Sequence, residues 1–271
     1  EQRGTGHAVA CAQAVWQGDH ILILNGDMPL ITPNLLAELL QMHIEKENAL
    51  TCIAAQTERP HGYGRVLSEN NSIVIKEEKE CTDQERQVTT VNAGVYVVER
   101  LFLEHALRQL DTNNQTGEVY LTDIVAIASK AGMSIGVLEA PFVLVQGVNN
   151  LADLANVEYF FLDRVRSYWL GRGVRLSDPA SISIDVDAVI GKGTVLGRGV
   201  HVLGNTRIGE GVTVEPYCVL TNAQIDNGAT IFAHSVINHS TIAADAKVGP
   251  FAHVRAEAVV GHGAVVGNFV E

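Results

Sequence analysis

Hydrophobic and polar residues follow two different periods along the chain, and the change falls near residue 180. Up to about residue 148, short apolar runs alternate with apolar residues at helical spacing. Strands are predicted at 21–24, 50–55, 72–77 and 91–98, and helices at 32–43, 100–110 and 121–132. This alternation of strands and helices is typical of a layered α/β domain.

The first predicted strand ends in a polar segment. Four consecutive aliphatic residues, 21–24, favour a strand buried on both faces of a parallel sheet. Asn25, Gly26 and Asp27 follow directly. They could simply form a turn that ends the strand. They could also form part of a ligand site, because ligands collect at the carboxyl ends of strands in open α/β sheets.

After Ser181 aliphatic residues recur every six positions. Fifteen positions keep this phase, with two steps of five: Ile184, Ile190, Leu196, Val202, Ile208, Val214, Leu220, Ile225, Ile231, Ile237, Ile242, Val248, Val254, Val260 and Val266. A small residue often precedes each by two positions, and glycine often follows, as at Gly191, Gly197 and Gly209. We expect the aliphatics to fill a narrow core and the glycines to tolerate the corner backbone. Three hexads per turn predict about five coils of a left-handed parallel β-helix.

A long helix with an apolar stripe is predicted at 151–170, between these two regions. The predicted domains are therefore an α/β domain at 1–150, a linker helix and connection at 151–180, and β-helix coils at 181–271. The chain starts without methionine and stops with the hexads still in phase. We expect a piece of a longer protein, with the α/β domain incomplete and only the N-terminal coils of the β-helix.

Composition and charge exclude several classes of protein. With 46% hydrophobic and 18% charged residues, the chain can bury real cores. A net charge of −12 argues against a nucleic-acid or anionic-membrane partner. There is no apolar run long enough for a membrane span, and no signal peptide. The four cysteines lack metal-ligand spacing and fit a reducing, cytoplasmic environment.

Nine short motifs in order, with the hexads, resemble one family over the whole chain. They are EQRGTGHA (1–8), NGDMPL (25–30), GYGR (62–65), KEEKECTDQERQ (76–87), VNAG (91–94), TGEVYLTD (116–123), QGVNN (146–150), GPFAHVR (249–255) and VGNFVE (266–271). The family is the bifunctional bacterial N-acetylglucosamine-1-phosphate uridylyltransferase/glucosamine-1-phosphate N-acetyltransferases. The resemblance implies a Rossmann-like nucleotidyltransferase domain followed by a β-helix acetyltransferase domain.

The resemblance also implies two reactions in the parent protein. The first is Mg²⁺-dependent uridylyl transfer from UTP to N-acetylglucosamine-1-phosphate, which makes UDP-N-acetylglucosamine for peptidoglycan and lipopolysaccharide. The second is acetyl transfer from acetyl-CoA to glucosamine-1-phosphate. A homotrimer assembled through the β-helix, in the bacterial cytoplasm, is expected.

Family roles transfer to individual residues of the nucleotide and metal sites. Asp27 and Asn149 match the protein ligands of Mg²⁺, although Asn149 could instead cap the helix at 151–170. Gly4 and Thr5 match residues at the uracil end, although an ordinary glycine turn is the alternative.

Other matches concern the nucleotide path and the sugar. Asn25 and Gly26 lie beside the metal aspartate on the nucleotide path, but the family commonly has tyrosine at the position of Asn25. Gly64, Glu77 and Asn92 match the positions that bind the N-acetylglucosamine moiety. Glu77 belongs to the acidic run EEKE, so a solvated charge is its alternative role.

Departures from the family limit what these residues are expected to do alone. The triphosphate loop would precede Glu1, and the histidine base and acetyl-CoA coils would follow Glu271. Arg255 matches a basic residue of the acetyltransferase site, no catalytic residue is assigned, and the 271-residue piece is expected to be nearly inactive. Histidines within the hexads are expected at surface or corner positions: His234, His239, His253 and His262.

Two other functions remain open. The chain could belong to another sugar-nucleotide pyrophosphorylase whose β-helix serves only assembly. It could also be a non-catalytic module that binds a sugar nucleotide.

Overall fold

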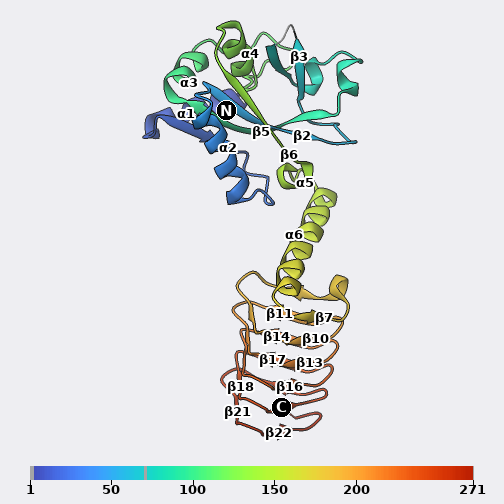
Figure 1. Ribbon diagram of the computed structural model, residues 1–271. Coiled ribbons are helices and arrows are strands. Elements are labelled where there is room, and N and C mark those ends of the chain that lie inside the picture. Colours follow the sequence, from blue (N-terminus) through green and yellow to red (C-terminus); the bar gives the residue numbers. More distant parts are fainter. Residues whose placement is uncertain (1–2, 70–71, 271) are drawn as a thin grey trace. The chain divides into compact units, whose positions relative to one another are not determined.

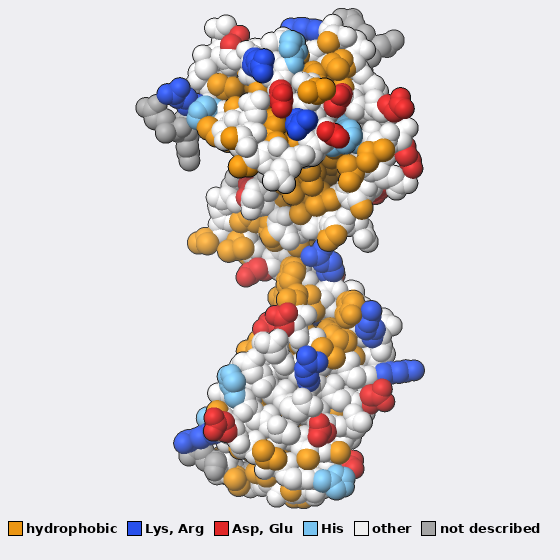
Figure 2. Space-filling view, turned by 90° about the vertical axis from the view of Figure 1, so that its left-hand side faces the viewer, with side chains coloured by type: hydrophobic (Ala, Val, Ile, Leu, Met, Phe, Trp, Pro, Cys, Tyr) orange, Lys and Arg blue, Asp and Glu red, His pale blue; other side chains and the backbone are white. Residues whose placement is uncertain are grey.

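The computed structural model describes residues 3–69 and 72–270 of the chain. They form two compact units, Glu1–Val157 and Glu158–Glu271 (Figure 1). On the face shown in Figure 2, acidic and basic side chains are interspersed over each unit. We describe each unit by itself.

The first unit is built on one sheet with the strand order β4-β3-β5-β2-β6, and β1 also pairs with β5. β2 and β6 run parallel, whereas β5 is antiparallel to β1, β2 and β3. The strands are β1 His20–Ile23, β2 Leu50–Gln56, β3 Arg65–Glu69, β4 Ser72–Lys76, β5 Thr90–Glu99 and β6 Ile135–Pro141. The strands predicted at 50–55, 72–77 and 91–98 are therefore confirmed.

Strand β1 differs from its prediction. It pairs antiparallel with β5, with Ile21 opposite Val98. Leu22 and Leu24 are 46% and 42% exposed. A strand buried on both faces of a parallel sheet was thus the wrong expectation. Among the described residues β5 is the only strand that pairs with β1, and only alternate side chains, such as Ile21, pack against the core.

Helices cover both faces of this sheet. Side chains of α3 and α4 pack on one face of β2 and β5, and side chains of α2 and α5 pack on the other. α2 begins as predicted, because the Thr32 hydroxyl accepts the Leu35 N–H at 3.3 Å. The helices are α1 Thr5–Cys11, α2 Pro33–Glu45, α3 Arg100–Leu107, α4 Asp123–Lys130, α5 Phe142–Val145 and α6 Leu151–Gly171, with 3₁₀ turns η1 Gln13–Val15, η2 Glu78–Glu80, η3 Glu85–Gln87 and η4 Pro179–Ser181.

Helix α6 starts in the first unit and ends in the second. Its N-terminal cap shows whether Asn149 could serve as the capping residue. The Asn150 side-chain oxygen accepts the N–H groups of Ala152 and Asp153 at 2.9 and 3.0 Å. Asp153 in turn accepts the N–H of Asn149 at 3.0 Å. The cap is therefore Asn150, and the alternative role of Asn149 as the cap is wrong.

The second unit is a parallel β-helix of about five turns, as predicted. Its short strands form three parallel sheets, β22-β19-β16-β13-β10-β7, β20-β17-β14-β11-β8 and β21-β18-β15-β12-β9. Thirteen of the fifteen aliphatic positions are buried, and Val260 and Val266 are partly buried. The left-handed sense of the coil stays a prediction.

The sheets include a strand, β7, that lies before the expected start of the hexads. The strands are β7 Arg175–Leu176, β8 Ser183–Ile184, β9 Val189–Ile190, β10 Val195–Leu196, β11 His201–Leu203, β12 Arg207–Ile208, β13 Thr213–Val214, β14 Val219–Thr221, β15 Gln224–Ile225, β16 Thr230–Ile231, β17 Val236–Asn238, β18 Thr241–Ile242, β19 Lys247–Val248, β20 His253–Val254, β21 Val259–Val260 and β22 Val265–Val266. Leu176 of β7 lies beside Leu196 of β10 and extends the core by one layer.

The corner role expected for the glycines that follow the aliphatics holds at Gly249, which has φ +97°, but not at Gly191 and Gly209. Gly191 and Gly209 lack a positive φ, so the corner-backbone explanation is wrong for them. A Cβ on Gly191 would lie 2.4 Å from the backbone carbon of Gly209 in the next coil. Gly191 and Gly209 are needed because adjacent coils approach closely at these positions. Left-handed backbone occurs at other positions, several of which are not glycine.

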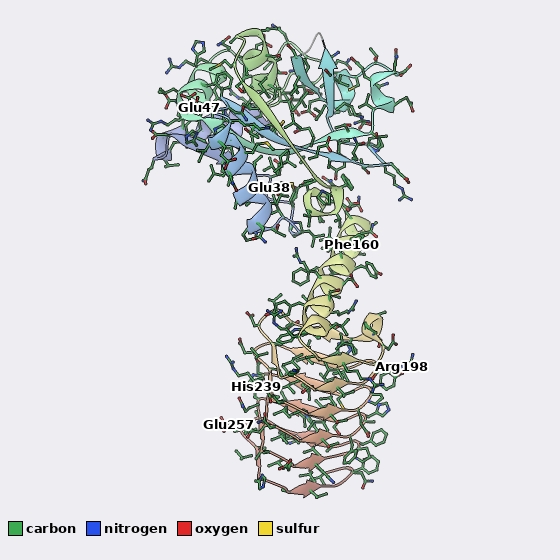
Figure 3. All side chains as sticks on the ribbon, in the orientation of Figure 1. Glu38, Glu47, Phe160, Arg198, His239 and Glu257 are labelled. Atoms are coloured by element: carbon green, nitrogen blue, oxygen red, sulfur yellow. The ribbon has the colours of Figure 1, made fainter. Side chains whose placement is uncertain are left out.

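These left-handed corner residues lie above one another in successive coils. Tyr217, His234, Phe251 and Phe269 have φ between 53° and 62° and form what we term the aromatic column. Their rings stack with centroid distances of 5.2, 4.9 and 5.7 Å. A second corner carries His239 and Glu257, which lie one above the other in Figure 3. The prediction that His234 and His239 occupy corners is confirmed.

Candidate functional site

A cavity of about 250 Å³ lies in the first unit. Its walls come from the segment after β1, the loop before β3, the strand β5, and residues 121–122 and 145–149. Seven of the ten predicted site residues line it: Thr5, Asn25, Asp27, Gly64, Glu77, Asn92 and Asn149. The fold therefore brings together motifs that are far apart in the sequence.

Asp27 and Asn149 approach each other across Gly147. The Val148 N–H donates to the Asp27 carbonyl at 2.9 Å, which ties the two segments together. A Cβ on Gly147 would lie 3.1 Å from Asp27 Oδ2 and 3.8 Å from Asn149 Nδ2. Gly147 therefore leaves open a space that any other side chain would fill.

The donors around this space fit Mg²⁺. A carboxylate and an amide, once its oxygen faces the ion, supply hard oxygen ligands. Within the described residues there is no cluster of three or more His, Cys, Asp or Glu side chains that could hold a metal alone. The pair therefore suits an ion that takes its remaining ligands from water and substrate phosphates.

Glu77 lies partly buried at the cavity wall and is not a freely solvated charge. Its Oε1 accepts a hydrogen bond from the Thr122 hydroxyl at 3.0 Å. Burial raises the pKa of the Glu77 carboxyl, against the lowering effect of Thr122. A Cβ on Gly64 would lie 3.7 Å from Glu77 Oε2, so Gly64 keeps the approach to this carboxylate open.

Asn92 is held on β5 by two hydrogen bonds. Its Oδ1 accepts the Gly94 N–H at 3.2 Å, and its Nδ2 donates to the Tyr96 hydroxyl at 2.7 Å. Gly94 has φ +72°, and a Cβ there would lie 2.3 Å from Asn25 Nδ2. Motif reasoning missed Tyr96, which also lines the cavity.

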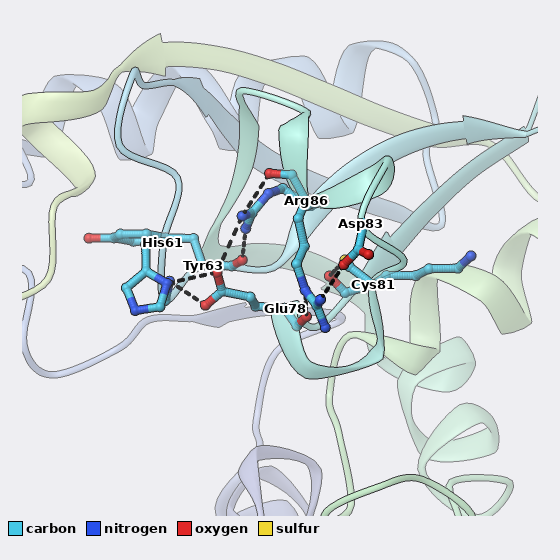
Figure 4. A network of polar contacts seen from close by, with 9 residues as sticks. His61, Tyr63, Glu78, Cys81, Asp83 and Arg86 are labelled. Atoms are coloured by element: carbon cyan, nitrogen blue, oxygen red, sulfur yellow. Dashed lines mark hydrogen bonds and ion pairs between the residues drawn. The ribbon is translucent and has the colours of Figure 1, made fainter.

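The loop before β3 is braced by Glu78, next to the predicted Glu77 (Figure 4). The Glu78 carboxylate accepts the Gly62 N–H and a hydrogen bond from His61 Nδ1 at 3.0 Å. Burial alone would raise the pKa of Glu78, but the Gly62 and His61 donors outweigh it and the pKa falls below its ordinary value. Glu78 thus holds in place a loop that lines the cavity.

Arg65 also holds this loop in place. It is 1% exposed and lies 3.5 Å from Glu78 Oε1. It also donates to the carbonyls of Tyr63 and Arg86. A buried guanidinium with carbonyl and carboxylate partners fixes the backbone around it. The sequence run EEKE gave no sign of which glutamate would do this.

Tyr63 joins the loop to the segment of the candidate metal site. Its hydroxyl accepts the Gly147 N–H at 3.3 Å, and its ring packs edge-on against Phe142. Burial raises the pKa of Tyr63, with a smaller effect from Asp153 and Asp27. The loop before β3 and the segment around Gly147, which form two walls of the cavity, are therefore linked.

Three predicted site residues lie away from the cavity lining. Gly4 packs against the backbone, since a Cβ there would lie 2.5 Å from the Val119 carbonyl oxygen. Gly26 is exposed beside the cavity, and Arg255 is exposed in the second unit directly after β20. Thr5, which does line the cavity, accepts the Leu121 N–H at 3.0 Å.

The cavity is acidic. Asp27 and Glu77 both line it, and no lysine or arginine does within the described part of the chain. A phosphate group would meet negative charge there unless a cation were bound beside it.

In the described segments, no helix is long and apolar enough to cross a membrane.

Comparisons with known proteins agree with this division into two parts. A family model described as "Nucleotidyl transferase" matches residues 1–142, and one described as "GMPPB C-terminal domain" matches residues 178–270. Relatives named "Bifunctional protein GlmU" are 40% identical in Synechococcus elongatus, 37% in Streptococcus agalactiae and 37% in Geotalea uraniireducens. Each similarity covers 100% of this chain and 60% of the relative. The chain thus spans about 60% of the length of these relatives, and the resemblance seen in the motifs is confirmed.

Proposed function

Because the chain belongs to the nucleotidyl transferase family, we propose that its first unit transfers a uridylyl group from UTP to N-acetylglucosamine-1-phosphate. The supporting observation is one cavity that combines the pair Asp27 and Asn149 with Gly64, Glu77 and Asn92. The product, UDP-N-acetylglucosamine, would serve peptidoglycan and lipopolysaccharide synthesis in the bacterial cytoplasm.

The acidic cavity suits this chemistry once a cation is present. An oxygen of the sugar phosphate attacks the α-phosphorus of UTP, and pyrophosphate leaves. Bound Mg²⁺ would offset the negative charge on the phosphoryl oxygens. We assign the Asp27 carboxylate and the Asn149 amide oxygen as its protein ligands, with Gly147 keeping the space between them open.

The other wall of the cavity suits a sugar. The Glu77 carboxylate, oriented by Thr122, can accept hydrogen bonds from sugar hydroxyls. Asn92 offers a fixed amide, and Gly64 lets the sugar approach without obstruction. In this proposal Gly4, Thr5, Asn25 and Gly26 lie along the nucleotide, with Gly4 and Thr5 at the uracil end.

Binding of UDP-N-acetylglucosamine to the purified chain, measured by calorimetry with and without Mg²⁺, tests the proposal. We expect Mg²⁺ to tighten binding in the wild type and to have no such effect in Asp27→Asn. Asp111→Asn, which removes a carboxylate outside the cavity lining, is the matched control. Equal Mg²⁺ dependence in wild type and Asp27→Asn would contradict the metal assignment.

For the whole protein we propose a second activity, acetyl transfer from acetyl-CoA to glucosamine-1-phosphate. The support is the word "bifunctional" in the names of the relatives and the exposed position of Arg255. Arg255 would attract the sugar phosphate. Arg255→Gln in the whole protein should raise the KM for glucosamine-1-phosphate, read as thiol release from acetyl-CoA. We also propose a homotrimer through the β-helix, which light scattering of the whole protein would test.

A second candidate is another sugar-nucleotide pyrophosphorylase whose β-helix serves assembly. The match of residues 178–270 to the "GMPPB C-terminal domain" favours it. A panel of UDP-, GDP-, ADP- and dTDP-sugars separates the two candidates. Preference for the uridine compound supports the first proposal, and preference for another base supports the second.

A further inference from the structure

Tyr96 lines the cavity and carries a hydroxyl that the proposed chemistry does not yet use. Tyr96 is 2% exposed, yet it is one of the residues that line the cavity. Its ring belongs to the core packed under α3 and α4. A buried hydroxyl normally has hydrogen-bond partners, so the partners of this one are informative.

A β-bulge brings Tyr96 and Asn92 together. In a regular strand, residues four apart are separated by about 13 Å. Here Asn92 lies opposite Ala54 and Tyr96 lies opposite Cys52, so four residues of β5 span only two residues of β2. Gly94, with φ +72°, lies inside this irregularity. The two side chains therefore point to the same face at close range.

The hydrogen bond between them has a defined direction. The Gly94 N–H donates to Asn92 Oδ1 at 3.2 Å, which fixes the amide with its Nδ2 on the other side. Asn92 Nδ2 then donates to the Tyr96 oxygen at 2.7 Å. The Tyr96 hydroxyl hydrogen is not used in this bond. No acceptor for it is found in residues 3–69 and 72–270.

We propose that Tyr96 donates a hydrogen bond to an oxygen on the sugar half of the bound ligand. The inference rests on the proposed function of the cavity and adds a specificity residue to it. Glu77, when ionised, can only accept hydrogen bonds, whereas the Tyr96 hydroxyl still has its hydrogen to donate. Sugar hydroxyls donate and accept at once, so a hexose matches this pair of side chains.

The inference accounts for a donor that would otherwise be buried without a partner. Leaving such a donor unsatisfied destabilises the folded protein, and a ligand oxygen removes that penalty. Burial raises the pKa of Tyr96 well above its ordinary value. The hydroxyl therefore keeps its hydrogen throughout the pH range in which the protein can be assayed.

Tyr96→Phe tests the inference, because it removes the hydroxyl and keeps the ring in the core. We would measure the Kd for UDP-N-acetylglucosamine, for UDP-glucose, and for the 3-, 4- and 6-deoxy analogues of UDP-N-acetylglucosamine. The variant should bind UDP-N-acetylglucosamine about 3- to 10-fold more weakly. For the one ligand that lacks the contacted oxygen, wild type and variant should bind equally. Tyr159→Phe, an exposed tyrosine outside the cavity lining, should match the wild type throughout.

Each result has a separate meaning. A uniform loss for every ligand would show that the hydroxyl acts only by holding Asn92, and would overturn the inference. An unchanged Kd for UDP-N-acetylglucosamine would also overturn it. If Tyr96→Phe unfolds, the same ligands are measured with the wild type alone. The inference then requires that one analogue binds about 3- to 10-fold more weakly than UDP-N-acetylglucosamine. It also requires that the hydrogen bond from Asn92 to Tyr96 is kept in that complex, as read from the side-chain amide NMR signals of Asn92. A wild type that binds none of the uridine ligands would overturn the proposed function itself.

Discussion

Buried His43, which lies against the exposed His20, should make the first unit less stable in mild acid. His43, on α2, is 0% exposed. Its Nε2 lies 3.0 Å from His20 Nδ1, and its Nδ1 lies 3.0 Å from the Thr51 hydroxyl. Burial, and then the nearby His20, lower the pKa of His43 from 6.5 to about 4. His43 therefore binds a proton more weakly in the folded protein than in the unfolded chain.

The sign and size of the effect follow from this difference. Between about pH 6.5 and 4 the unfolded chain binds a proton at His43 and the folded unit does not, so the free energy of unfolding falls as the pH falls. Each pH unit contributes about 1.4 kcal/mol, so the full window is worth about 3 kcal/mol. Above pH 6.5 the effect vanishes. A loss of this size is a large fraction of the 5–15 kcal/mol that is typical of domains.

Urea unfolding at several pH values would measure the loss. Trp16 packs partly buried against the core of the first unit, so its fluorescence reports that unit once Trp169 is replaced by phenylalanine. His43→Gln removes the titrating ring and should flatten the pH dependence between 6.5 and 4 by about 3 kcal/mol relative to its parent. If the two proteins lost stability in parallel over this window, the assignment of the effect to His43 would be wrong.

Three further predictions concern the site and the second unit. Gly147→Ala places a Cβ 3.1 Å from a carboxylate oxygen of the candidate metal site, so Mg²⁺ affinity, read from Mg²⁺ titration of ligand binding, should fall about 10-fold. Glu78→Gln removes the charged acceptor of the loop before β3 and should weaken UDP-N-acetylglucosamine binding about 5-fold, whereas Glu45→Gln on α2 should not. Ile208→Asp buries an unpaired charge in the narrow core and should cost several kcal/mol in thermal unfolding. Val189→Asp, at a position 45% exposed, is its control, and equal melting of the two would refute the core assignment.

The fold of the second unit could be predicted because one local rule repeats in every hexad. Each aliphatic residue must point into the core, so the period appears directly in the sequence. The role of glycine could not be predicted in the same way. Gly191 is constrained by the backbone of Gly209 in the next coil, and a contact between coils leaves no periodic signal that distinguishes it from a turn.

Pairing between distant segments limited the prediction for the first unit. The exposure of β1 depends on which strands lie beside it, and that is not encoded in residues 21–24. The candidate site shows the same limit. Motifs led to Asp27, Asn149, Glu77 and Asn92, which the fold gathers around one cavity. Tyr96 was missed because its position beside Asn92 depends on the β-bulge between β2 and β5, which no local sequence pattern marks.

The aromatic column restricts how the length of the second unit can change. Its members are 17, 17 and 18 residues apart, at Tyr217, His234, Phe251 and Phe269. Inserting six residues would keep an aliphatic at every inward position but would move each later ring to a different corner. Inserting a whole turn would preserve both the core and the stack. Viable insertions and deletions should therefore come in whole turns, so that this unit lengthens or shortens in steps.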